Sequence, residues 1–121
     1  MRKTSLFALA AAAAMLSGPS AAHHGWGGYQ DEEFSLTGTV EMANLGGPHG
    51  LLRVNSGGAV WDVVLSPPTR IQSAGLTLAA VPRGTQVRAE GHRHRDLQRR
   101  EMKTERLVVG ERVFNLYPER S

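Results

Sequence analysis

The sequence predicts a mainly β protein: a small OB-like antiparallel β-barrel with one short helix, preceded by a cleaved signal peptide and a flexible arm. Three observations predict this class. An apolar run follows two basic residues at the N-terminus, short alternating segments are separated by Gly and Pro turns, and one short helical pattern lies mid-chain. Short strands joined by tight turns, with no long helical period, are typical of small sandwiches and barrels.

The first 22 residues have the three parts of a secretory signal peptide. Two basic residues precede an apolar run over residues 6–16, and small, turn-prone residues follow up to Ala22. The run is shorter than the roughly 20 residues that a membrane-spanning helix needs, so it predicts a cleaved signal rather than an anchor. We expect a mature chain that begins at His23, is periplasmic or secreted, and has no transmembrane segment.

Signal cleavage changes the charge balance. Of the 14 basic residues, Arg2 and Lys3 lie in the signal, which leaves 12 against 11 acidic residues. Nucleic-acid binding usually needs a net positive field, so the near-neutral mature chain predicts no nucleic-acid partner. The chain has no cysteine, which excludes disulfides, thiolate metal sites and covalent c-type haem.

The mature chain predicts two regions, a His/Gly-rich flexible arm over residues 23–33 and a single β domain over residues 34–121. The arm has three glycines and no hydrophobic period. Apolar residues then alternate with polar ones over residues 34–42, which indicates a half-buried strand. Residues 51–65 predict a hairpin around a turn at residues 55–58.

The second half of the domain predicts a helix and further strands. Helix formation is expected to begin at Pro68 and to end at Gly75. Residues 85–91 alternate again, and residues 106–114 indicate a closing hairpin. The strands are connected closely enough for antiparallel pairing, and a helix between the third and fourth strands is typical of an OB-like barrel. The alternative is an open α+β sheet, because periodicity does not reveal closure.

Several short motifs lie in order along the chain. They are His23-His24 after the signal, Phe34 with residues 36–40, the Pro48-His49 turn, residues 66–76, and residues 84–87 leading to Gly91. On these motifs the chain resembles the family of short exported bacterial proteins catalogued as domain of unknown function 6152. The resemblance implies export and assigns no catalytic residue. Residues 92–95 and 101–106 lie outside the family's general pattern.

Histidines without cysteine are the main chemical signal of the mature chain. Imidazole is a preferred ligand of copper, zinc and nickel near neutral pH. We therefore predict a bound metal ion, copper first and zinc or nickel otherwise, and no other cofactor. The candidate ligands are His23, His24, His49, His92 and His94.

These histidines fall in three places. Cleavage before His23 frees an α-amine that can chelate Cu(II) together with the terminal imidazoles. Residues two apart in a strand point to the same side, so His92 and His94 can offer two nitrogens to one ion. Each place also has an interpretation without metal. His23 and His24 can be a polar leader that helps secretion, and His49 can be a turn residue. His92 and His94 can be the solvated basic end of a strand.

No catalytic constellation is visible in the sequence. There is no Gly-x-Ser-x-Gly motif, and Glu101 and Glu105 alternate with Lys and Arg as in a solvated, salt-bridged strand. The sequence thus predicts a non-enzymatic, exported small binding domain that binds a transition metal through histidines. The alternative is an accessory module that binds an envelope protein or surface through its Arg-rich strand, without metal.

Overall fold

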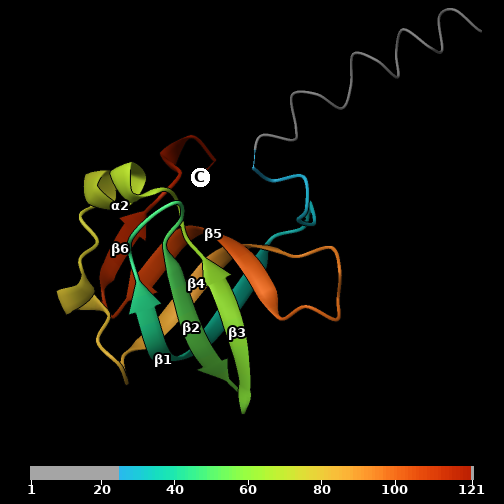
Figure 1. Cartoon of the computed structure of the whole chain (residues 1–121), viewed down its shortest axis with the longest axis horizontal. Coiled ribbons are helices and arrows are strands. Elements are labelled where there is room, and N and C mark those ends of the chain that lie inside the picture. Colours follow the sequence, from blue (N-terminus) through green and yellow to red (C-terminus); the bar gives the residue numbers. More distant parts are fainter. Residues whose placement is uncertain (1–24, 121) are drawn as a thin grey trace, which may run out of the picture.

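The structure is a computed structural model that describes residues 25–120, so the predicted signal peptide lies outside the described residues. Strands dominate this part of the chain (Figure 1). The elements in order are β1 (Phe34–Asn44), β2 (Leu51–Ser56), β3 (Ala59–Val64), α2 (Pro68–Ala74), the 3-10 turn η2 (Leu78–Ala80), β4 (Gln86–Arg93), β5 (Glu101–Val109), β6 (Arg112–Asn115) and the 3-10 turn η3 (Pro118–Arg120).

Five of these strands close into a barrel. β1 pairs with both β2 and β4, β2 pairs with β3, and β4 pairs with β5, all antiparallel. β3 and β5 close the ring through residues 62–64 and 101–103, and β6 extends the sheet beside β5. The predicted OB-like barrel, with its helix between the third and fourth strands, is confirmed.

The prediction that neighbouring strands pair antiparallel is wrong for the pair that closes the barrel, because β3 and β5 are parallel. A closed ring with an odd number of strands cannot alternate direction throughout, so one neighbouring pair has to run the same way. The other four neighbouring pairs of the ring are antiparallel, so the pair that closes the ring, β3 and β5, is the parallel one.

Alternating apolar side chains fill the barrel as the sequence predicts. Leu36 and Val40 of β1 are buried while Ser35 and Thr37 between and beside them are exposed. α2 begins at Pro68 and ends at a left-handed Gly75 with a φ of 79°, as predicted. The helix lies at one end of the barrel (Figure 1), and its Ile71 side chain is buried in the core.

Part of the predicted arm lies against the barrel. We call residues 25–33 the N-terminal segment. Its Tyr29 forms an isolated β-bridge with His94, and the Gln30 amide donates to the Arg93 carbonyl at 2.8 Å. The segment has no hydrophobic period, but the Trp26 ring packs edge-on against Tyr117, 5.1 Å between centroids. No helix among the described residues is long and apolar enough to span a membrane.

Candidate metal centre

A β-bulge turns one carboxylate of β5 away from the barrel interior. Glu90 of β4 pairs with Arg106 and the next residue, Gly91, pairs with Thr104, so Glu105 is an extra residue without a partner in β4. A bulge redirects the side chain of the extra residue and is frequent next to functional sites. Thr104 before the bulge and Leu107 after it stay buried.

His92 lies opposite this bulge, on the outer face of β4. Val87 and Ala89 of that strand belong to the core, and His92 has the opposite parity. A side chain on an outer face is normally solvated, yet His92 is only 5% exposed. An aromatic ring covers His92: Trp26 of the N-terminal segment packs edge-on against the imidazole, with 5.5 Å between the ring centroids.

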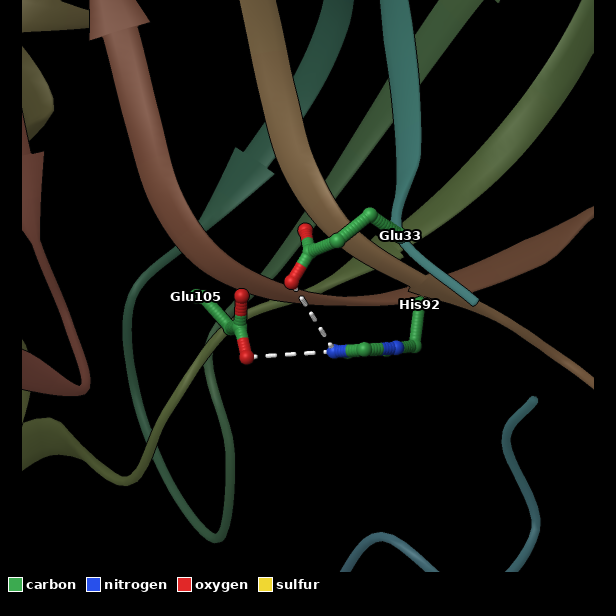
Figure 2. A group of neighbouring side chains, drawn as sticks. All are labelled: Glu33, His92 and Glu105. Carbon is green, nitrogen blue, oxygen red and sulfur yellow. Dashed lines mark hydrogen bonds and ion pairs between the residues drawn. The ribbon is translucent and has the colours of Figure 1, made fainter. Parts of the chain in front are cut away.

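Two carboxylates converge on one nitrogen of this imidazole (Figure 2). Glu105 Oε2 lies 3.1 Å from His92 Nε2, and Glu33 Oε1, at the end of the N-terminal segment, lies 3.6 Å from the same atom. One donor atom from each residue lies within 4.8 Å of the other two. Zinc ligands at about 2.0–2.2 Å from the ion stand roughly 3–4 Å apart, so a small shift of the exposed Glu33 side chain would suffice.

The other imidazole nitrogen fixes the state of the ring. His92 Nδ1 lies 3.0 Å from the backbone carbonyl oxygen of Glu32. A carbonyl oxygen only accepts hydrogen bonds, so Nδ1 carries the proton and donates. Nε2 then faces two carboxylates that cannot donate when ionised. The contact of Nε2 with Glu105 therefore needs either a shared proton or a metal ion, and the backbone contact of Nδ1 is the kind that orients metal-ligating histidines.

Glu105 is the most buried member of the cluster, at 1% exposure. Its Oε2 accepts a hydrogen bond from Arg120 Nε at 2.9 Å as well as facing His92. Its Oε1 has no hydrogen-bond partner among the described residues, and Arg106 NH1 lies 3.9 Å away. A buried carboxylate oxygen without a donor retains its capacity to bind a cation.

A buried lysine adjoins the cluster on the same strand. Lys103 is 5% exposed, and its Nζ donates to the Gly25 carbonyl at 2.6 Å and lies 4.8 Å from the centre of the Trp26 ring. Burial lowers the pKa of this amine, and the nearby Arg120 guanidinium lowers it further. Burial beside a second cation thus makes the charged form of this amine less favourable here than in water.

The other predicted ligands lie elsewhere. His23 and His24 lie outside the described residues, and His49 is exposed in the β1–β2 loop. His94 Nδ1 accepts the Asp96 amide at 3.0 Å, and its Nε2 lies 3.4 Å from Arg99 NH1. Among residues 25–120, the groups that can hold one ion do not include His49 or His94. His92 and His94 separate because β4 ends at Arg93, between them.

Sequence reasoning missed Glu33 and Glu105. The expectation that residues 99–106 form a solvated strand is wrong for residues 102–105, all of which are buried. These residues are covered because β5 pairs with β3, β4 and β6 and because the N-terminal segment lies over its outer face. One signal was present: Glu105 is two residues before the core residue Leu107, although the bulge that orients it is not readable from the sequence.

The arginines at the end of β4 and in the β4–β5 loop make several bonds within the domain. Arg93 stacks over the Trp61 ring at 4.9 Å and donates to the Leu97 carbonyl. Arg95 donates to the Gly27 carbonyl at 3.2 Å, and Arg99 pairs with Glu101 at 3.1 Å. Much of this charge holds the loop and the N-terminal segment in place.

The family assignment rests on a match that spans most of the chain. A family model described as "Family of unknown function (DUF6152)" matches residues 11–105. The chain belongs to the DUF6152 family. The matched span contains Glu33, His92 and Glu105, so all three members of the cluster lie within the family domain.

Comparison with solved structures supports the barrel. The chain is similar to a chain of the crystal structure of the S. pombe Stn1-Ten1 complex, with a TM-score of 0.53 and 15% identity. The similarity covers 66% of the DUF6152 chain and 59% of the other, so it spans less than two thirds of that protein. At this identity the likeness shows the fold alone. A comparison with curated proteins found no match.

Proposed function

We propose that this protein is an exported, non-enzymatic binding domain that holds one divalent transition-metal ion through Glu33, His92 and Glu105. The observation that carries the proposal is the imidazole of His92, whose Nδ1 is fixed by a backbone carbonyl while Nε2 faces two carboxylate oxygens. Three protein ligands leave at least one coordination position for water or another ligand.

The donor set selects the class of ion. Imidazole suits zinc, copper, iron and nickel, and carboxylates add preference for harder ions, so one nitrogen and two oxygens fit Zn²⁺ or Cu²⁺ rather than Cu⁺. The two carboxylates offset the charge of a divalent ion, and the Arg120 guanidinium at Glu105 Oε2 adds one positive charge beside it. Without metal, a proton shared by His92 and Glu105 and the Arg120 guanidinium balance the same two carboxylates, and the cluster is then a buried hydrogen-bonded pair.

These two states differ by a proton, which gives a direct test. Binding of Zn²⁺ or Cu²⁺ should displace the Nε2 proton, so the calorimetric enthalpy should change between buffers of different ionisation enthalpy. We expect about one equivalent to bind. Glu33→Gln should weaken binding roughly 100-fold, because it removes a charged ligand whose side chain is 64% exposed and not needed for the fold.

Glu32→Gln is the matched control. Glu32 is the preceding residue and exposed, and only its backbone carbonyl contacts His92. Equal affinities of the two variants would contradict the proposal. Double replacement of His23 and His24 by Ala tests the terminal Cu(II) chelate separately: loss of copper binding in that variant alone would move the site to the terminus.

The accessory-module alternative remains a second proposal with less support. Its specific observation is Leu97, 60% exposed in the Arg-rich loop. The intramolecular bonds of Arg93, Arg95 and Arg99 count against it, because these charges are already partly engaged.

A further inference from the structure

A small pocket opens beside His92, away from the carboxylates. It has a volume of about 160 Å³ and is lined by residues of the N-terminal segment, the end of β4 with its loop, and η3. A cavity of this size holds a ligand of roughly six heavy atoms. The lining side chains that the argument uses are Trp26, Asp31, His92, Arg95 and Arg120.

Both guanidinium groups in the lining are held by Nε. Arg120 Nε donates to Glu105 at 2.9 Å, and its guanidinium carbon lies 4.0 Å from the centre of the Trp26 ring. Arg95 Nε donates to the Gly27 carbonyl at 3.2 Å. The terminal nitrogens of Arg120 make no hydrogen bond to any described residue. An arginine fixed in this way presents a preorganised fork for an oxyanion.

The charge of the lining is positive. Its one carboxylate belongs to Asp31, whose side chain is 97% exposed and 3.7 Å from Arg95 NH2, so solvent screens most of this pair. Two guanidiniums line the pocket against this one solvated carboxylate, and Glu105, which pairs with Arg120, lies outside the lining.

We infer that this pocket binds a small oxyanion, a carboxylate or a phosphate, between Arg95 and Arg120. The inference goes beyond the metal site, because the arginines supply the binding and no metal is required. The terminal nitrogens of the two anchored guanidiniums, of which Arg95 NH2 lies 3.7 Å from the solvated Asp31, match two oxygens of such an anion. Trp26, with its ring under the Arg120 guanidinium, closes one wall.

The test uses the purified protein, freed of metal with EDTA that is then removed by dialysis, and two probes, inorganic phosphate and malonate. Binding is measured by calorimetry and by the NMR shift of the Trp26 indole N–H, which reports on the pocket itself. Binding of either probe with a Trp26 shift supports the inference, and the tighter probe names the anion class. Absence of binding by both probes would overturn it.

Variants separate the pocket from general charge. Arg95→Gln should weaken binding about tenfold, as expected for loss of a charged hydrogen-bond donor. Arg95→Lys keeps the charge but not the fork and should also weaken binding, which covers the case in which the Gln variant does not fold. Arg99→Gln is the control in the same loop, outside the lining. Equal weakening by Arg99→Gln would overturn the placement.

Discussion

Glu105→Gln should reveal both roles of the buried carboxylate. The change keeps the shape of the side chain, which is 2% exposed, and removes the charge that faces His92 at 3.1 Å and Arg120 at 2.9 Å. Breaking a fully buried pair costs about 3–5 kcal/mol. The Arg120 side chain is 37% exposed and can be rehydrated, so we expect a smaller loss of about 2 kcal/mol.

For a domain of about 100 residues this loss corresponds to a fall in Tm of roughly 8–16 °C. Circular dichroism melts at pH 7 in EDTA measure it. Zn²⁺ in place of EDTA should stabilise the native protein by about 2.7 kcal/mol at 100 times the Kd, which raises its Tm, and should leave the Tm of Glu105→Gln nearly unchanged. Glu101→Gln, in the same strand but outside the cluster, is the control and should keep its zinc response. A full zinc-induced rise in Glu105→Gln would refute the assignment of Glu105 as a ligand.

Three further outcomes follow from particular residues. Intact-mass analysis of exported protein should give an N-terminus at His23; a mass that retains the apolar N-terminal run would contradict cleavage. Gly91→Ala should unfold at much lower denaturant concentration, because the new Cβ would collide with the Lys103 carbonyl and lie 2.9 Å from Thr104 Cα; an unchanged midpoint would show that β4 and β5 can separate freely. The Arg106 hydrogen bond lowers the pKa of Glu90 below its ordinary 4.5, so this carboxylate stabilises the fold above pH 4.5 and loses that contribution as pH falls through the lowered pKa. Glu90→Gln should therefore be less stable at neutral pH, with the difference closing in acid melts; a constant difference would contradict this.

The local elements of the fold were predictable because their signals are local. Alternation around Leu36 and Val40 predicts β1, and Pro68 with Gly75 predicts both ends of α2. The pairing of β3 with β5 was not predictable, because it joins residues about forty positions apart and nothing in either strand's sequence indicates the other as its neighbour.

The site was half predictable for a related reason. The histidine count drew attention to His92, but its ligand partners depend on a bulge at Glu105 and on the packing of the N-terminal segment that brings Glu33 over the barrel. A glutamate among lysines and arginines is expected to be exposed to solvent unless another segment is known to pack over it. The aromatic contact of Trp26 with His92 supplies that cover, and a glycine-rich segment gives no periodic sign of it.

The most direct test of the metal centre is the anomalous scattering of a crystal grown with Zn²⁺, measured on both sides of the zinc absorption edge. The account requires one peak at about 2.0–2.2 Å from His92 Nε2 and from a carboxylate oxygen of both Glu33 and Glu105. Peaks confined to other histidines, with a proton-mediated contact of about 3.1 Å preserved between His92 and Glu105, would contradict it and leave the cluster as a buried ion pair.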